Sequence, residues 1–82
     1  MKVEMLKSEW GEDMENLNHD YHVTLYKMSD DGREWYRINI ENTGDGRYAR
    51  MEFDGEGARG FAQDEFTDIV YGGKPPLQYA WK

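Results

Sequence analysis

Residues 20–53 read DYHVTLYKMSDDGREWYRINIENTGDGRYARMEF, and this stretch decides the fold. Apolar and polar side chains alternate along it in three runs, which is the pattern of strands that have one buried face. Two clusters of turn-forming residues, 29–32 and 42–46, separate the runs. Short turns between consecutive strands predict an antiparallel meander whose strands are residues 21–28, 33–41 and 47–53.

The alternation also assigns the side chains of the meander to two faces. The face expected to form the core carries Tyr21, Val23, Leu25, Tyr36, Ile38, Ile40, Ala49, Met51 and Phe53. The outward face carries His22, Thr24, Tyr26, Trp35, Arg37, Asn39, Tyr48 and Arg50. Aromatic rings interleaved with arginine are typical of platforms for single-stranded nucleic acid. Because these strands carry net negative charge, cross-strand aromatic pairing or a protein-binding face is the favoured interpretation.

The segment before the meander has helical periodicity. Its apolar residues recur every three or four positions and share one sector of a helical wheel: Val3, Leu6, Trp10, Met14 and Leu17. We therefore expect an amphipathic helix over residues 3–17, weakened by Gly11. An N-terminal strand followed by a shorter helix from about Trp10 is the alternative.

A second helix is expected after the meander. Three glycines within residues 55–60 predict a loop, so the helix begins at Phe61 or Ala62 and ends before Gly72. Its expected apolar stripe is Ala62, Phe66, Ile69 and Val70. Its expected solvent-facing acids are Asp64, Glu65 and Asp68, the first two placed near the first turn, where they complement the helix dipole.

The expected fold is therefore α+β, a three-stranded antiparallel meander flanked by an N-terminal and a C-terminal helix. Leu77, Tyr79 and Trp81 alternate, which allows a short C-terminal edge strand over the sheet. With 82 residues the chain has room for one domain, residues 1–82. Low apolar content, 38%, predicts a thin core that depends on aromatic side chains.

Charge is the most informative bulk property. Asp and Glu number 17 against 10 Lys and Arg, a formal net charge of -7. Binding of a polyanion needs Lys and Arg to displace counterions, so this balance disfavours direct contact with nucleic acid or an anionic membrane. A basic protein surface is the expected partner, and a homodimer stays open. The chain has no cysteine, no apolar run of membrane-spanning length and no secretory signal, so the cytoplasm is the expected compartment.

Four motifs of catalytic or ligand-binding sites occur only in part. Gly55-x-Gly57-x-x-Gly60 matches a dinucleotide-binding turn, but too few residues follow it to build a parallel βαβ unit. Residues 41–52 match part of a calcium loop, yet their flanks predict strands where that motif needs helices. His19 and His22 lack a third ligand at a suitable spacing. The two serines, Ser8 and Ser29, suit capping and turn positions. We therefore expect no enzymatic activity, no cofactor and no metal.

The whole chain resembles the small acidic inhibitors encoded by phages and mobile elements, including anti-CRISPR proteins and DNA mimics. The resemblance covers size, absence of cysteine, excess acid and a meander flanked by helices. It implies stoichiometric binding to the basic groove of a nucleic-acid-handling enzyme, with carboxylates in the places of phosphates. The expected partner-binding residues are Glu12, Asp13, Asp30, Asp31, Trp35, Asp64, Glu65 and Asp68. The alternatives are a single-stranded nucleic-acid platform and a small structural or homo-oligomeric phage or bacterial protein.

Overall fold

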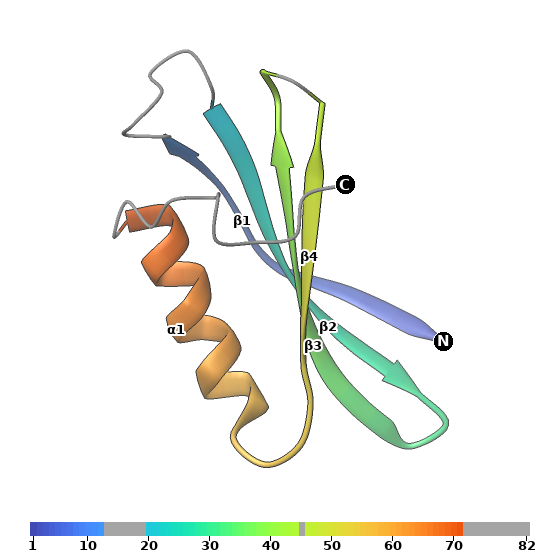
Figure 1. The fold of residues 1–82 in the computed structure, drawn as a ribbon. Helices are drawn as coiled ribbons and strands as arrows, with labels where there is room; N and C mark the ends of the chain where they lie inside the picture. Colours follow the sequence, from blue (N-terminus) through green and yellow to red (C-terminus); the bar gives the residue numbers. More distant parts are fainter. Residues whose placement is uncertain (13–19, 45, 72–82) are drawn as a thin grey trace.

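The computed structural model describes residues 1–12, 20–44 and 46–71. Four strands form one antiparallel sheet and one helix follows them: β1 (Lys2–Glu12), β2 (Asp20–Asp30), β3 (Arg33–Asn42), β4 (Tyr48–Phe53) and α1 (Ala58–Tyr71). The strands lie in the sheet in chain order, β1-β2-β3-β4. α1 packs along one face of the sheet (Figure 1), and no helix within the described ranges covers the opposite face.

The structure confirms the predicted meander, both in its strands and in its faces. β2 pairs with β3 from Tyr21↔Asn42 to Asp30↔Arg33, and β3 pairs with β4 from Tyr36↔Phe53 to Glu41↔Tyr48. Alternate residues of these strands, the predicted core-face residues, pack against α1, and the most buried are Tyr21, Val23, Leu25, Ile38, Ile40 and Ala49. The β2–β3 turn has a positive φ at both central residues, Asp31 and Gly32, as tight hairpins require.

The predicted N-terminal helix is wrong, because residues 2–12 form β1, which pairs antiparallel with β2. The pairing register shifts between Met5 and Lys7, so Leu6 is an extra, bulged residue. Leu6 packs against the core, whereas Val3 and Trp10 pair with residues of the opposite face. The bulge thus gives a strand the three- and four-residue apolar spacing that is typical of a helix.

The described residues therefore form a four-stranded antiparallel sheet with one helix after it, in place of the expected three-stranded meander between two helices. The alternative of an N-terminal strand agrees with β1. The helix that was expected to follow that strand, with Met14 and Leu17, lies outside the described residues. The expected C-terminal edge strand, residues 77–81, also lies outside them.

Gly11 in β1 allows a buried tyrosine to approach the backbone. Gly11 and Tyr21 are register partners, and a Cβ atom on Gly11 would lie 2.4 Å from Cε2 of Tyr21. The Tyr21 hydroxyl donates a hydrogen bond of 2.9 Å to the carbonyl oxygen of Ile69. That carbonyl belongs to the last turn of α1, where helical amides are no longer available as donors. Tyr21 therefore joins β1 and the end of α1 to the centre of the sheet.

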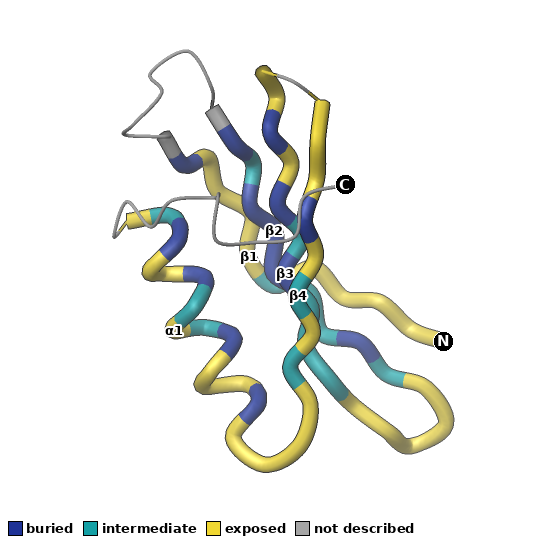
Figure 2. The backbone as a smooth tube through the Cα atoms, viewed as in Figure 1, coloured by how far each residue is buried: buried dark blue, intermediate teal, exposed yellow. Residues whose placement is uncertain are grey.

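α1 begins three to four residues earlier than predicted, so Ala58, Arg59 and Gly60 are helical instead of loop. The first turn therefore contains no acidic residue, and the predicted contribution of Asp64 and Glu65 to the helix dipole is wrong. The predicted stripe is confirmed at its centre, since the buried residues of α1 are Ala58, Ala62, Phe66 and Ile69. Figure 2 shows this buried side turned towards the sheet. Within the described part of the chain, no helix has the length and apolar character needed to cross a membrane.

Candidate protein-binding site

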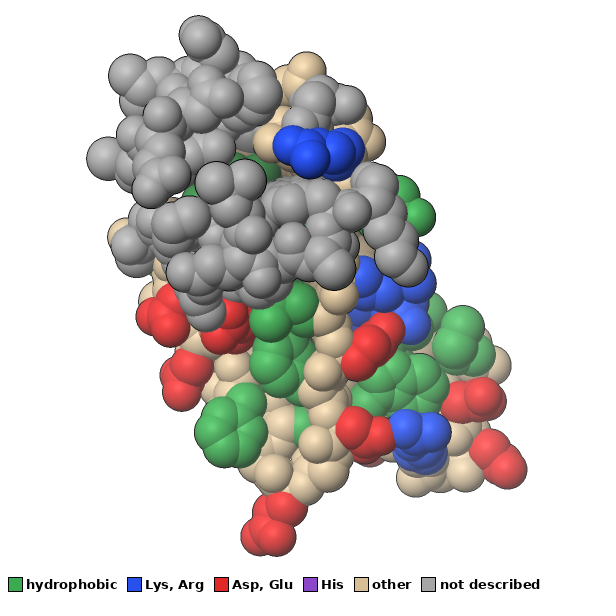
Figure 3. Space-filling view, viewed as in Figure 1, with side chains coloured by type: hydrophobic (Ala, Val, Ile, Leu, Met, Phe, Trp, Pro, Cys, Tyr) green, Lys and Arg blue, Asp and Glu red, His purple; other side chains and the backbone are tan. Residues whose placement is uncertain are grey.

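A groove lies where β4 ends and α1 begins. Its volume is about 390 Å³, and it is lined by Glu52, Phe53, Asp54, Ala58, Phe61, Asp64 and Glu65. Four of these side chains are carboxylates, and three form an apolar surface between them. Figure 3 shows acidic side chains on both sides of an apolar strip between α1 and β4. We call this feature the β4–α1 groove.

The loop between β4 and α1 positions the two walls of the groove. Gly55 and Gly57 have φ values of 88° and 79°, a region that glycine adopts without strain. The amide of Ala58 donates to the carbonyl of Gly55 at 3.3 Å, and the amide of Phe61 donates to that of Gly57 at 3.1 Å. The dinucleotide-like glycine pattern is therefore a reversing loop that begins α1. It brings residues 61–65 beside the end of β4.

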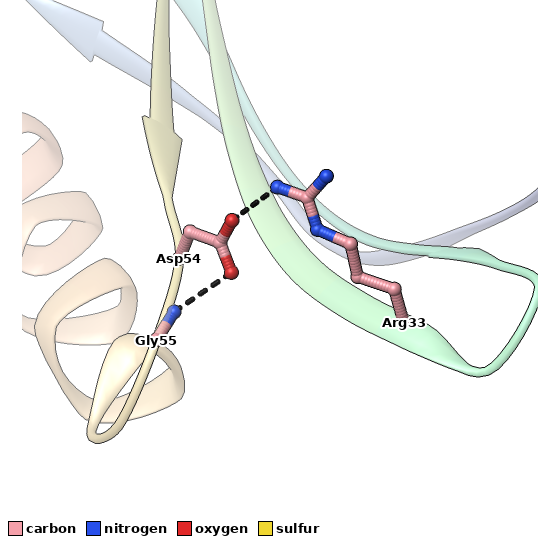
Figure 4. Close-up of polar contacts among 3 residues, drawn as sticks. All are labelled: Arg33, Asp54 and Gly55. Carbon is pink, nitrogen blue, oxygen red and sulfur yellow. Dashed lines mark hydrogen bonds and ion pairs between the residues drawn. The ribbon is translucent and has the colours of Figure 1, made fainter.

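Two of the groove carboxylates are held by arginines of β3. Asp54 forms an ion pair with Arg33 and accepts a 2.8 Å hydrogen bond from the amide of Gly55 (Figure 4). The Arg33 hydrogen bond first, and then the Gly55 amide, hold the pKa of the Asp54 carboxyl below its ordinary value. Glu52 accepts a 2.6 Å hydrogen bond from Nε of Arg37, its register partner. These contacts fix the β4 wall of the groove.

The α1 wall of the groove carries the other two carboxylates. Asp64 is exposed and Glu65 is half-buried. Phe61, 66% exposed, stands one turn before them on the helix. An apolar surface between carboxylates suits the side chain of lysine or arginine, because the alkyl stem packs on the rings while the cation meets the acids. The groove is therefore suited to binding a basic side chain.

The structure distributes the predicted partner-binding residues over several places. Asp64 and Glu65 line the groove, and Asp68 is exposed one turn further along α1. Asp30 and Asp31 lie at the β2–β3 turn, where Asp30 pairs with the amino terminus at 3.7 Å. Three more predicted residues lie elsewhere: Trp35 is half-buried on β3 with the Arg33 guanidinium 5.1 Å from its ring centroid, Glu12 ends β1, and Asp13 lies outside the described residues. The acids therefore do not form one continuous surface.

Sequence reasoning missed the other half of the groove. Glu52 and Asp54 are separated from Asp64 by ten residues or more, and periodicity alone does not show that the 54–57 loop folds back. The sequence did contain one indication of this surface, the position of Phe61. Phe61 lies outside the apolar stripe of Ala62, Phe66 and Ile69, and a large aromatic residue on the solvent side of a helix indicates a contact surface.

The sheet face opposite α1 is a second surface of interest. We call it the open face; cross-strand registers place on it Val3, Met5, Ser8, Trp10, Glu12, Asp20, His22, Thr24, Tyr26, Met28, Asp30, Arg33, Trp35, Arg37, Asn39, Glu41, Tyr48, Arg50 and Glu52. All eight residues predicted to point outward are among them. Ser8, interpreted as a helix cap, instead lies in β1, with its Oγ 2.6 Å from Nε2 of His22. The His22 ring stacks on Trp10 at a centroid distance of 4.8 Å.

The partial ligand motifs take structural roles in the described residues. The amide of Asn42 donates to the carbonyl of Arg47 at 2.8 Å, and this hydrogen bond closes the β3–β4 hairpin. Among the described residues, no three His, Asp or Glu side chains gather in a metal-binding arrangement. The chain matches no protein-family model, and neither a curated protein nor a solved structure is similar to it.

Proposed function

We propose that this protein is a non-enzymatic binding module that takes a basic segment of a partner protein into the β4–α1 groove. The observation that carries the proposal is the pairing of an apolar surface with four carboxylates in one groove. The formal net charge of -7 supports it, because long-range attraction speeds the encounter with a cationic partner. Asp64 and Glu65 provide the contact charge, and Phe61 provides the apolar anchor.

The partner class that fits this groove best is a nucleic-acid-handling enzyme, whose substrate channel is rich in Lys and Arg. A stoichiometric inhibitor of the anti-CRISPR or DNA-mimic kind binds such a channel with carboxylates in place of phosphates. The cytoplasm, where such enzymes act, is the compartment that goes with this role. A single-stranded nucleic-acid platform on the open face has less support, since Arg37 there is already paired with Glu52.

The proposal can be tested with a defined basic probe. An octa-arginine peptide is titrated into ¹⁵N-labelled protein, and an octaglutamate peptide is the control. We expect amide shifts to concentrate in residues 52–65. The double variant Asp64→Asn/Glu65→Gln should weaken binding about tenfold or more, because charge-assisted hydrogen bonds contribute about 1.5–3 kcal/mol each.

A charge-matched variant separates groove binding from bulk attraction. Asp30→Asn/Asp31→Asn removes the same charge at the β2–β3 turn and should weaken binding much less than the groove variant. Equal losses in the two variants, or shifts spread over the whole sheet, would contradict the proposal. The finer role is tested by DNA cleavage with purified CRISPR nucleases at a 1:1 ratio of protein to enzyme. Inhibition should be lost in the groove variant and should weaken as salt rises.

A further inference from the structure

The α1 wall of the β4–α1 groove places one aromatic ring beside two carboxylates. Phe61 is followed by Asp64 three residues later and by Glu65 four residues later, all within α1. Residues at these spacings are neighbours on a helix surface, with Cβ atoms about 5–6 Å apart. All three residues line the groove. A ligand that reaches this wall therefore meets a flat apolar surface and negative charge at the same time.

The ring of Phe61 is held by the loop before it, yet most of its surface stays in water. A Cβ atom added to Gly57 would lie 3.2 Å from Cε2 of Phe61, so the ring packs against the bare backbone of the loop. The Phe61 amide donates a hydrogen bond of 3.1 Å to the Gly57 carbonyl. Phe61 is nevertheless 66% exposed. The loop thus orients the ring and leaves the rest of it available to a ligand.

The β4 wall shows which cation the carboxylates of this groove accept within the chain itself. Asp54 pairs with the guanidinium of Arg33, and Glu52 accepts a 2.6 Å hydrogen bond from Nε of Arg37. The Arg33 guanidinium also lies 5.1 Å from the centroid of the Trp35 ring. Arg33 therefore contacts a carboxylate and an aromatic ring together. The α1 wall offers the same two kinds of group to a side chain from outside.

Arginine and lysine differ in how well they use an aromatic ring beside a carboxylate. The guanidinium ion is planar and weakly hydrated, so it can stack on a ring while its N–H groups, which lie in its own plane, point towards carboxylates. The lysine ammonium is a compact, strongly hydrated ion that gains less from lying against a ring. A wall built from a ring and two acids consequently favours arginine.

We propose that the β4–α1 groove selects arginine over lysine in the basic segment that it binds, with the guanidinium stacked on Phe61 and hydrogen-bonded to Asp64 or Glu65. This inference rests on the proposed function and narrows the partner to one whose binding segment carries arginine. A lysine segment of equal charge is attracted as strongly at long range, because the formal net charge of -7 does not distinguish the two cations. It is held less tightly once in the groove.

Two peptides of equal charge test the preference. Octa-arginine and octalysine are titrated separately into the full ¹⁵N-labelled chain, and each affinity is measured from the amide shifts of residues 52–65. We expect octa-arginine to bind at least about threefold more tightly, since one cation–π contact at an exposed ring changes affinity roughly two- to fivefold. Bidentate pairing also favours arginine at any carboxylate, so the ratio of the two affinities is compared between variants.

Changes at Phe61 separate ring stacking from carboxylate pairing. Phe61→Leu keeps an apolar side chain but removes the ring, so the arginine-to-lysine affinity ratio should fall roughly two- to fivefold. Phe61→Trp should raise the ratio, because indole forms the strongest cation–π contacts. Tyr71→Leu is the matched control; it removes a 72% exposed ring of α1 that does not line the groove, and it should leave the ratio unchanged. Circular dichroism checks that each variant is folded.

The outcomes distinguish this inference from the proposed function. Equal affinities for the two peptides, with both shifting residues 52–65, would overturn arginine selection and leave groove binding intact. A ratio that is the same in wild type and in Phe61→Leu would overturn it too, by assigning the preference to the carboxylates alone. If neither peptide shifts residues 52–65, the groove proposal itself fails, and arginine selection fails with it.

Discussion

The two faces of the sheet are built from alternate residues of the same strands, yet α1 packs on only one of them, and exposed apolar side chains occur on the other. On the α1 side, Val23, Leu25 and Ile38 are fully buried. On the open face, Met5 and Trp10 keep more than half of their surface in water. The comparison teaches that, among the described residues, the packing of α1 accounts for the difference in burial between the two faces.

The largest expected effect comes from removing the side chain of Phe66, through which α1 packs on the sheet. Phe66 is 1% exposed, and Phe66→Ala should reduce the free energy of unfolding by about 3–5 kcal/mol, through lost burial and the cavity left behind. Urea denaturation followed by circular dichroism measures it. Trp10→Ala is the matched change on the open face. It should cost less than about 1 kcal/mol, because 62% of the Trp10 side chain is already exposed to water. Equal losses would contradict the comparison.

A smaller effect is expected at Gly11, whose backbone lies against the ring of Tyr21. Gly11→Ala places a Cβ atom 2.4 Å from the ring, which forces Tyr21 or β1 to move and should destabilise the protein by about 1–3 kcal/mol. Gly60→Ala is the control, since an added Cβ meets no atom within 4 Å and the residue is helical. That change should stabilise the protein by about 0.5–1 kcal/mol. Thermal melts should show shifts of opposite sign, and shifts of the same sign would contradict the Tyr21 packing.

The smallest effect concerns the Asp54–Arg33 pair. Because Arg33 lowers the pKa of Asp54 in the folded state, ionised Asp54 stabilises the fold above its ordinary pKa of 3.8. This contribution is lost as pH falls through the lower folded-state pKa. Asp54→Asn should therefore melt below wild type at pH 7, and the gap should close as pH falls from about 5 towards 2. Thermal melts across that range measure it, at low salt, since the pair is exposed. A gap that stays constant with pH would assign the difference to another cause.

The sequence predicted the two faces of the meander because apolar and polar residues alternate within each of its three runs, and the predicted strand bounds differ from the observed ones by one or two residues. The prediction for residues 2–12 was wrong, because the bulged residue Leu6 interrupts the alternation and gives the strand an apolar spacing that is typical of a helix. The predicted start of α1 was too late because Gly60, unfavourable in helices, tolerates a solvent-facing helical position. In each case tertiary packing overrode a local preference.

The candidate site was predicted only in its helical half. Asp64 and Glu65 were expected on the exposed side of a helix, and the structure places both in the groove. Asp54 was assigned to a flexible loop, because no local pattern reveals its ion pair with Arg33, 21 residues earlier. Sites built from contacts across a loop need the fold before they can be recognised.

The strand order has a consequence for how the chain acquires its structure. Each strand pairs with the strand immediately before it in the sequence, so every pairing closes a short segment. A sheet whose strands pair in sequence order has shorter loops to close than a sheet with crossover connections, so it is expected to fold faster than such a sheet. During synthesis on a ribosome, each new strand emerges when its partner is already available. Packing of α1 on the sheet then completes the core. The hydrogen bond from the Tyr21 hydroxyl to the carbonyl of Ile69 joins two residues that are 48 positions apart in the sequence.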